Sequence, residues 1–551
     1  MVRIRVPTGD FHMQNHTERI RADEMKTVKF KKPAILASLA VVFIILCVIS
    51  YFSSSPSSDH PHLVKAIRPA RFAFAKHGAV EAEKPAPIRR LNRSENDNEP
   101  RKKKVVEMML HAWNGYKNYS WGANELRPES KAPHTAGIFG GEKMPATIVD
   151  AADTLYIMGL TKEYEEARQY IKDNFDMSKA TGTLSVFETT IRFLGGLLSL
   201  YALTKEQFYM DKARSVGEAL LPAFNTPTGI PTGGLNMQSK GGGRMFGGNA
   251  VLAELGSLHL EFMYLSQITG SPIFGKKVRK VRNALDKVEK PSGLYYNFIN
   301  ADTGKWTSNK HISLGALGDS FYEYLIKSWL QSNKKDQQAR RMYWEASDAL
   351  RANIVFKSES GLTYVGELKD GVKESKMGHL ACFSVGMFAL QAVNEHNEQR
   401  KKSTMQLAEE LGATCHESYI RSNTGIGPEM FYFDDSDDAT SKSGENNYIL
   451  RPEVIEGFFY LWRLTGKTKY REWVWDAISA IDKYCRVEAG FAGLVNVYDP
   501  KQGHDDVQQS FFLAETLKYA YLTFTDPSVI PLDQWVFNTE AHPLPVMDIT
   551  V

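Results

Sequence analysis

Two glutamates open one of the most apolar stretches of the sequence, Leu450–Leu461. Pro452 is favoured at the first position of a helix, because the N–H group that it lacks would have no partner there. Glu453 and Glu456 would then lie three residues apart in the first two turns, on one face of the helix. The helix dipole stabilises such carboxylates as anions. For this fragment alone, an ordinary acidic first turn is a better explanation than a catalytic pair.

Other acids also occur at or near the heads of apolar segments: Glu188, Asp319, Glu323, Glu429 and Glu515. Glu188 precedes Arg192 by four residues, which places opposite charges on one helix face. An acid inside an apolar run, such as Glu515, is costly unless it is paired. Each acid alone is typical of a salt bridge or a cap. Seven acids at one end of a single barrel would instead line a carboxylate pocket, which suits glycoside hydrolysis or a hard cation.

Helical periodicity, which would position these acids, dominates the sequence from about residue 103 onward. Fourteen apolar-periodic segments lie near 103–117, 149–160, 162–175, 185–203, 206–221, 249–269, 272–288, 312–331, 336–353, 377–396, 402–420, 450–466, 468–484 and 508–525. Most form pairs in which a strongly apolar segment precedes a more charged one, which indicates an inner and an outer layer. Seven pairs predict an all-α fold, an (α/α)7 toroid. A helical solenoid is the alternative, although no fixed-length repeat supports it.

Long loops separate the helix pairs, at 222–248, 289–311, 354–376, 421–449 and 485–507. Several contain Gly-aromatic turns that are typical of short β-hairpins. Long ordered loops on a rigid helical scaffold usually carry binding residues. We therefore expect the functional site at the end of the toroid where these loops gather.

The first 102 residues differ from the rest in composition. Residues 34–52 form an uncharged, mostly apolar run of about the length that spans a bilayer, and lysines at 26–32 precede it. Positive charge stays on the cytosolic side, which predicts a cytosolic tail at 1–33 and a type II signal anchor. A cleaved signal peptide is the rival interpretation. Residues 53–102 cannot bury a core and read as a lumenal stem, so the remaining residues, 103–551, would form one lumenal domain.

The charge balance and the minor motifs exclude several classes of site. The chain has 67 Lys and Arg against 64 Asp and Glu, so nothing indicates a nucleic-acid partner. Asp434–Asp438 imitates the start of an EF-hand loop, but Ala439 replaces the required glycine, and a solvated acidic loop is the simpler reading. Gly241–Gly243 fits no nucleotide fingerprint and reads as a flexible loop. Asn92 and Asn118 begin N-glycosylation sequons, which are frequent by chance.

Six strings share a detailed pattern: Ser185–Arg192, Leu317–Leu325, Met377–Phe383, Arg451–Glu456, Asp505–Thr516 and Phe537–Pro543. In their composition and order they resemble the class I α-1,2-mannosidases, glycoside hydrolase family 47. The resemblance covers about residues 103–545 and implies an (α/α)7 barrel that is plugged by a C-terminal hairpin. It also implies a Ca²⁺ ion at the barrel floor, bound by Thr539 and by waters.

The resemblance assigns roles to the acids. The acidic catalytic set is Glu188, Asp319, Glu429 and Glu453. Positions that contact sugar or hold calcium-bound waters are Arg192, His379, Arg451, Glu456, Phe511 and Glu515. The family inverts configuration, which needs one acid and one base on opposite faces of the sugar. We expect Glu453 as the base and Glu188 as the acid, acting directly or through a water, with Asp319 as the rival acid.

The cysteines allow one lumenal disulfide. Cys382, Cys415 and Cys485 follow the membrane segment. The resemblance selects Cys382–Cys415 as the disulfide, which leaves Cys485 free and buried. No clustered His and Cys spacing favours Zn²⁺.

The implied function is removal of α-1,2-linked mannose from high-mannose N-glycans. The alternative is a mannose-recognising quality-control protein of the same fold with little catalysis. Family members of the endoplasmic reticulum carry an arginine where this chain has Leu317, and 226–231 and 361–365 resemble the Golgi subgroup. An arginine could select one glycan branch through its fixed donors. Leu317 therefore predicts a Golgi enzyme that trims nine or eight mannoses towards five. The alternatives are residence in the endoplasmic reticulum, and specificity set by the loop 222–248 while Leu317 only packs.

Overall fold

A computed structural model describes residues 98–243, 249–434 and 437–548 of the chain. The predicted cytosolic tail, membrane segment and most of the stem therefore lie outside the described residues, as does the sequon at Asn92. The first described helix, α2 (Glu99–Ser120), begins four residues before its predicted start at 103. Pro100 in its first turn favours this earlier start, because a proline is tolerated where no N–H partner exists.

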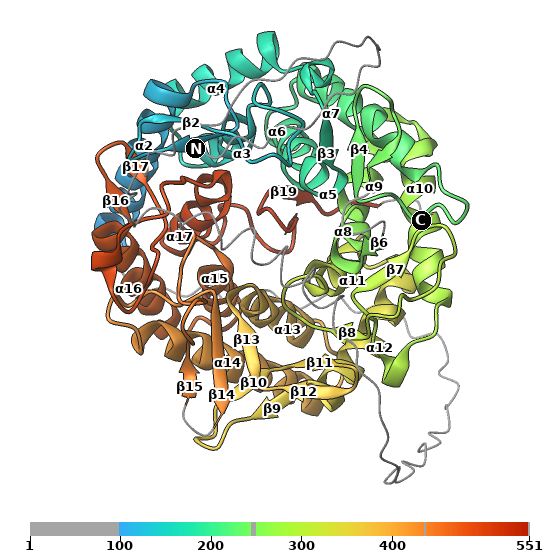
Figure 1. Cartoon of the computed structure of the whole chain (residues 1–551), viewed down its shortest axis with the longest axis vertical. Coiled ribbons are helices and arrows are strands. Elements are labelled where there is room, and N and C mark those ends of the chain that lie inside the picture. The colour runs from blue at the N-terminus through green and yellow to red at the C-terminus, as the bar shows by residue number, and fades with distance from the viewer. Residues whose placement is uncertain (1–97, 244–248, 435–436, 549–551) are drawn as a thin grey trace, which may run out of the picture. The chain divides into compact units, whose positions relative to one another are not determined.

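Helices in the described residues form seven pairs (Figure 1): six join consecutive helices, and the seventh joins the last helix to the first. The pairs are α3 (Ala146–Ile157) with α4 (Thr161–Asn174), α6 (Gly195–Thr204) with α7 (Gln207–Leu220), α9 (His259–Thr269) with α10 (Pro272–Lys287), α11 (Asp319–Gln331) with α12 (Gln337–Asn353), α13 (Ser384–Val393) with α14 (Glu398–Ile420), α15 (Glu453–Thr465) with α16 (Lys469–Tyr484), and α17 (Leu517–Thr523) with α2. The first member of each pair contacts the first member of the next, and η9 (Phe512–Thr516), which continues into α17, contacts α3. The first members thus close into an inner ring, and the second members lie outside it.

Burial explains which helices form the inner ring. Inner helix α13 buries every residue from Ser384 to Ala392. Outer helix α16 buries only one face: Tyr470, Val474, Ala477, Ile478 and Ile481. This spacing follows the helical period, so α16 covers the inner ring and exposes its charged face. The predicted alternation of apolar and amphipathic helices is confirmed.

Four inner helices begin later than the sequence predicts. The predicted helix at 249–269 is interrupted: β6 (Asn249–Val251) pairs with β7 (Phe298–Asn300), and α8 (Leu252–Gly256) precedes α9. The predicted helices at 312–331, 377–396 and 450–466 begin instead at residues 319, 384 and 453. Their first residues pair with distant strands or form irregular turns, and this pairing outweighs the local helical period.

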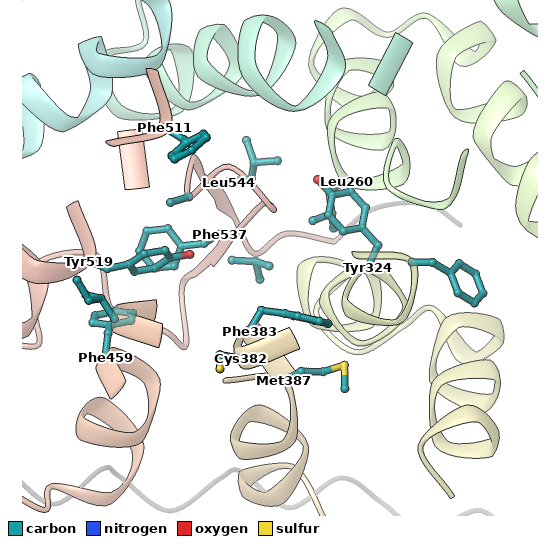
Figure 2. Close-up of a cluster of buried hydrophobic side chains, with 14 of the residues drawn as sticks. Leu260, Tyr324, Cys382, Phe383, Met387, Phe459, Phe511, Tyr519, Phe537 and Leu544 are labelled. Carbon is teal, nitrogen blue, oxygen red and sulfur yellow. The ribbon is translucent and has the colours of Figure 1, made fainter. Parts of the chain in front are cut away.

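Short strands form eight small two- or three-stranded sheets in the described residues. The last hairpin, β18 (Trp535–Phe537) with β19 (Pro543–Pro545), contacts two non-adjacent inner helices, because β18 packs on α11 and β19 packs on α6. Figure 2 shows Phe537 among side chains of the inner helices, with its ring 5.9 Å from that of Phe459 and 5.5 Å from that of Tyr519. The hairpin therefore lies inside the inner ring.

Two loop interpretations were wrong. Gly242 and Gly243 form strand β5, which pairs with β4 (Gly234–Asn236), instead of a flexible loop. In the acidic stretch, Asp434 ends strand β14 (Met430–Asp434), and Asp437 and Asp438 begin strand β15 (Asp437–Thr440), which pairs with β14, so these three acids do not lie in a loop. In both places an antiparallel partner supplies the backbone hydrogen bonds that the local sequence did not indicate.

The disulfide prediction is confirmed. Cys382 and Cys415 are bonded, with their Cα atoms 6.2 Å apart, and Cys485 is free and buried. The bond joins η7 (His379–Phe383), at the head of inner helix α13, to outer helix α14. Among the described helices, one segment, Val186–Thr204, is long and apolar enough to cross a membrane, and 78% of it is buried within the inner ring.

Candidate active site

The acids of the catalytic set lie where the chain enters inner helices. Asp319 is the first residue of α11 and Glu453 is the first residue of α15. Shortly before each of them the backbone is left-handed, with φ of 78° at Leu317 and 69° at Leu450. This conformation is unfavourable for a branched side chain and is kept only where the surrounding structure enforces it. The two strained leucines turn the chain sharply, so that each acid sits at the start of its helix.

Glu453 is an ionised carboxylate that still reaches solvent. Its Oε2 lies 2.9 Å from His379 Nδ1, and His379 Nε2 lies 2.8 Å from the hydroxyl of Tyr419. Burial alone would raise the pKa of Glu453, but the hydrogen bond and charge of His379 and the charge of Arg451 outweigh it and lower that pKa. The Glu453 side chain is 12% exposed, whereas His379 is 1% exposed. The buried ring of His379 therefore orients the Glu453 carboxylate.

Glu429 is held by a bidentate ion pair with Arg451. The Nε and Nη2 atoms of Arg451 each lie 2.6 Å from one carboxylate oxygen of Glu429, and both side chains are 16% exposed. Such a bidentate pair fixes geometry as well as charge. Arg451 lies two residues before Glu453, so the same turn of chain positions both acids.

Asp319 has the opposite electrostatic environment. Its Oδ1 accepts a hydrogen bond of 2.7 Å from the N–H of Ser320, yet burial and the charges of Glu323 and Glu453 raise its pKa to about 7. The carboxyl group can therefore hold a proton near neutral pH. The charge of Glu453 contributes to the raised pKa of Asp319, and the pKa values of the two groups are shifted in opposite directions, which is the pattern of an acid and a base.

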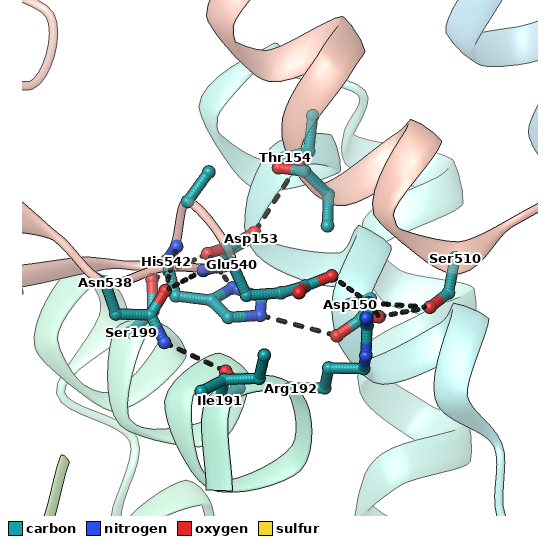
Figure 3. Close-up of polar contacts among 12 residues, drawn as sticks. Asp150, Asp153, Thr154, Ile191, Arg192, Ser199, Ser510, Asn538, Glu540 and His542 are labelled. Atoms are coloured by element: carbon teal, nitrogen blue, oxygen red, sulfur yellow. Dashed lines mark hydrogen bonds and ion pairs between the residues drawn. The ribbon is translucent and has the colours of Figure 1, made fainter. Parts of the chain in front are cut away.

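Arg192 connects Glu188 to the plug hairpin. Its Nε lies 2.8 Å from Glu188 Oε2, and its Nη1 contacts Glu540, which follows β18. Figure 3 shows the guanidinium of Arg192 beside Asp150 and Ser510. The rings of Phe139 and Phe511 lie 5.8 Å and 5.6 Å from its guanidinium carbon. Glu188 is thus paired with an arginine that charge and aromatic contacts fix in place.

Two π-helical segments carry residues of this cluster. Arg192 lies in η3 (Thr189–Leu194), which follows α5 (Val186–Glu188), and Glu515 lies in η9. Single π-turns inside helices are rare and occur frequently at functional sites. Both segments belong to the inner ring, at the ends that carry the acids.

Buried carboxylates accumulate beneath the catalytic set. Lys327 neutralises Glu323, and its Nζ lies 4.0 Å from Glu456 Oε1. Burial raises the pKa of Glu456 and of Glu515, and the neighbouring carboxylates raise both further. The described part of the chain therefore brings together more buried carboxylates than cations, which favours a bound cation.

The surroundings of Thr539 fit a hard cation. Its N–H lies 3.4 Å from the Tyr324 hydroxyl, which donates to Glu261 Oε1 at 2.6 Å. The other oxygen, Oε2 of Glu261, is buried without a hydrogen-bond partner among the described residues, and burial raises the pKa of this carboxyl to about 7. An oxygen-rich, under-neutralised environment matches the ligand preference of Ca²⁺. No group of three or more His, Cys, Asp or Glu ligands occurs in the described residues, so waters would have to complete the shell.

Sequence reasoning missed three buried acids of the cluster: Asp150, Glu261 and Glu540. Asp150 and Glu261 lie inside apolar stretches of α3 and α9, so the criterion that identified Glu515 applies to them as well. Glu540 lies beside Thr539 in a string already singled out. Leu317 packs on Val251, Ala253 and Phe298 and remains partly exposed.

Comparison with known proteins gives matches over most of the chain. The sequence profile of glycosyl hydrolase family 47 matches residues 108–546. Mannosyl-oligosaccharide 1,2-alpha-mannosidase mans-2 of Caenorhabditis elegans is 58% identical, over 95% of this chain and 100% of that protein. Mannosyl-oligosaccharide 1,2-alpha-mannosidase IB of Homo sapiens is 51% identical, over 84% of this chain and 72% of that protein. The solved structure of an alpha-1,2-mannosidase from Trichoderma reesei superposes with a TM-score of 0.75 and 28% identity, over 81% of this chain and 99% of that one.

Proposed function

The chain belongs to glycosyl hydrolase family 47, and we propose that it removes α-1,2-linked mannose from high-mannose N-glycans. It is a glycosidase, and relatives that are 51% and 58% identical carry the name mannosyl-oligosaccharide 1,2-alpha-mannosidase. One observation of the structure carries the chemistry: Glu453 and Asp319 begin two inner helices, and their environments shift their pKa values in opposite directions.

In the proposed reaction Glu453 is the general base. Its carboxylate takes a proton from a water molecule, and that water attacks the anomeric carbon of mannose from the face opposite the leaving oxygen. His379 keeps the Glu453 carboxylate ionised and oriented. A single displacement of this kind inverts the anomeric centre. NMR of the first product should therefore show β-mannose, and an initial α-anomer would contradict the mechanism.

The structure favours Asp319 over Glu188 as the proton donor to the leaving oxygen. The pKa of Asp319 is raised to about 7, whereas Arg192 holds Glu188 in an ion pair at 2.8 Å. Mannosyl fluoride tests this choice, because its leaving group needs no proton. Asp319→Asn should hydrolyse α-mannosyl fluoride but not the glycan. If Glu188→Gln shows this behaviour and Asp319→Asn does not, Glu188 is the donor.

We propose Ca²⁺ as the resident metal ion, with the hydroxyl and carbonyl oxygens of Thr539 as its protein ligands. The unpartnered Oε2 of buried Glu261 and the excess of buried carboxylates support this. A bound Ca²⁺ would offset these negative charges and bind sugar hydroxyl groups. The residues of this chain that would surround its waters are Glu261, Glu456, Glu515 and Glu540.

We propose that the enzyme is a type II membrane protein of the Golgi that trims nine- or eight-mannose glycans towards five. Leu317 supports this, because an apolar side chain offers no fixed donors with which to select one branch. A time course of product isomers should show several eight-mannose isomers for the wild type. Leu317→Arg should reduce the number of eight-mannose isomers that form. Leu317→Met is the control for lost packing on Phe298. A wild type that stops at one eight-mannose isomer would contradict the Golgi assignment.

The activity itself is tested with the full-length protein in detergent and a nine-mannose glycan. Release of free mannose supports the proposed function. Binding of the glycan without release would make the chain a mannose-recognising member of the family. Sedimentation of the protein with carbonate-washed membranes, and its protection from added protease in sealed vesicles, test the proposed topology.

A further inference from the structure

A histidine from the plug hairpin lies between two buried aspartates of one inner helix. Asp150 and Asp153 are three residues apart on α3 and so share a face. His542 Nδ1 lies 2.8 Å from Asp153 Oδ2, and His542 Nε2 lies 3.4 Å from Asp150 Oδ1 (Figure 3). All three side chains are fully buried.

A proton on each ring nitrogen would satisfy both contacts with the two carboxylates. Asp153 also faces Lys518 Nζ at 2.9 Å and accepts a hydrogen bond of 2.8 Å from the hydroxyl of Ser199. Burial alone would raise the pKa of Asp153, but Lys518 and His542 outweigh it and lower that pKa to about 2. In the described part of the chain, neither Asp150 Oδ1 nor His542 Nε2 has a hydrogen-bond partner, so their contact of 3.4 Å is an ion pair that no other group shares. A neutral imidazole carries one N–H, so only an imidazolium supplies a donor to each carboxylate.

The charge of His542 agrees with this geometry. Burial lowers the pKa of His542, but the charge of Asp153 and the hydrogen bonds to Asp150 and Asp153 raise it by more. Lys518 is the other cation that faces the ring, and it opposes this change. The net result is a buried imidazolium between two carboxylates.

Asp150 also contacts Arg192, which holds Glu188 of the catalytic set. Its Oδ2 accepts a hydrogen bond from the hydroxyl of Ser510 and lies 3.5 Å from Arg192 Nη1. Ser510 is itself fixed, because its N–H donates to Glu125 Oε1 at 2.8 Å. Arg192 in turn holds Glu188. Three contacts therefore lead from the ring of His542 to the Glu188 carboxylate.

The surrounding backbone prevents the ring from swinging away. Ala541, with φ of 56°, precedes His542, and the carbonyl of Ala541 accepts a hydrogen bond of 2.7 Å from Lys518 Nζ. The ring also packs closely on α6, where a Cβ atom at Gly196 would lie only 3.3 Å from His542 Cε1. The hairpin thus presents His542 in one orientation.

We propose that His542 is a positioning residue for the glycosidase reaction, whose Nε2–H group fixes Asp150 and, through Asp150, the alignment of Arg192 and Glu188. The plug hairpin then does more than fill the inner ring, because it supplies the charged contact with Asp150 on which the orientation of this side of the site depends. The inference rests on the proposed function, since it concerns the same reaction.

Two substitutions separate positioning from simple structural support. The side-chain amide of Asn occupies the place of Nδ1, so His542→Asn keeps the bond to Asp153 and loses the bond to Asp150. The longer Gln places its amide where Nε2 lies, so His542→Gln keeps the bond to Asp150. We expect His542→Asn to lower kcat about 100-fold, the cost of a misplacement of about 1 Å, with KM unchanged. His542→Gln should retain most of the wild-type kcat.

The experiment uses full-length enzyme, a nine-mannose glycan and measurement of the bound calcium of each variant. Equal losses of kcat in the two variants, in step with their melting temperatures, would overturn the proposal, as would unchanged kcat in His542→Asn. A loss that follows loss of calcium would also overturn it. If neither variant folds, Ser510→Ala removes the hydroxyl that bonds Asp150 and contacts Arg192, and it must lower kcat at constant KM, or the proposal fails. A wild type that releases no mannose would instead refute the proposed function.

Discussion

Two ion pairs with the same i, i+4 spacing show that the inner and outer rings differ in how far they expose charged side chains to solvent. Glu323 and Lys327 lie at i and i+4 on inner helix α11, where their side chains are 4% and 2% exposed. Arg214 and Glu218 lie at i and i+4 on outer helix α7, 2.9 Å apart and 55% and 53% exposed. In sequence the two patterns look alike. The ring to which each helix belongs decides whether a broken pair leaves a buried charge or a solvated one.

The largest effect is expected from the acid that opens inner helix α15. Glu453→Gln keeps the shape of the side chain and its contact with His379 but removes the base, so turnover should fall about 1,000-fold. Binding of the glycan should be largely unchanged, because the interaction lost is one made in the transition state. Initial rates of mannose release and equilibrium glycan binding measure the two quantities.

A matched control comes from the outer ring. Glu472 on α16 is 51% exposed and pairs with Arg101, so Glu472→Gln should leave turnover unchanged. If Glu453→Gln retained a tenth or more of the wild-type rate, Glu453 would not be the base. The inner and outer rings would then differ in burial but not in their contribution to catalysis.

Breaking the buried ion pair should have the next largest effect. Lys327→Met leaves Glu323 without its cation and should lower the free energy of unfolding by about 3–5 kcal/mol. Because the cost comes from the unpaired carboxylate, adding Glu323→Gln should restore part of the stability. Denaturation midpoints of the single and double variants measure this. A double variant less stable than Lys327→Met would show that the pair acts through other contacts.

Sequence reasoning predicted the inner and outer layers of helices, because this distinction depends on long apolar periods. The outer helices are the clearest case, because the one-faced pattern of Tyr470, Val474, Ala477, Ile478 and Ile481 on α16 is what a covering helix requires. The acids that we propose to be catalytic were singled out because their motifs are specific. Asp150 and Glu261 carry the same local sign as Glu515, an acid inside an apolar helix, but they lie outside the specific motifs and their partners are distant in sequence.

The irregular starts of the inner helices could not be predicted. A left-handed backbone at Leu317 and Leu450 opposes the local preference of leucine and is imposed by contacts far along the chain. The π-turns of η3 and η9 likewise have no period of their own in the sequence. Strand pairing of 249–251 with 298–300 overrides the helical pattern at the start of the predicted helix 249–269. These departures from local preference gather at the ends of the inner helices that carry the acids.

Removal of calcium should weaken the inner ring selectively. A ligand that binds only the folded state at about 1,000 times its dissociation constant stabilises that state by about 4 kcal/mol. Exhaustive chelation should therefore lower the melting temperature and stop turnover, and Thr539→Ala should do the same in the presence of calcium. Differential scanning calorimetry with metal analysis tests this. Full activity of protein shown to be free of calcium would exclude the metal.

The pH profile should separate the acid from the base. Asp319 must be protonated to donate, and its pKa of about 7 means that its acid form is lost as the pH rises through 7. Above that pH, kcat/KM should fall about tenfold per unit. The lowered pKa of Glu453 keeps the base ionised until the pH drops below the usual glutamate value. With α-mannosyl fluoride the decline above pH 7 should vanish, and a decline that persists would assign it to another group.

The smallest effect is expected from the exposed pair on α7. A double-mutant cycle with Arg214→Ala and Glu218→Ala should give a coupling energy of no more than about 0.3–0.5 kcal/mol, because both side chains are more than half exposed. Its orientation lowers the value further: the basic residue precedes the acidic one, which is the less favourable order along a helix, whereas Glu323 precedes Lys327 on α11. The coupling should also disappear in about 1 M salt, where charges are screened within about 3 Å. A coupling energy above about 1 kcal/mol that survives in salt would mean that spacing decides the strength of such pairs, and the distinction between the rings would fail.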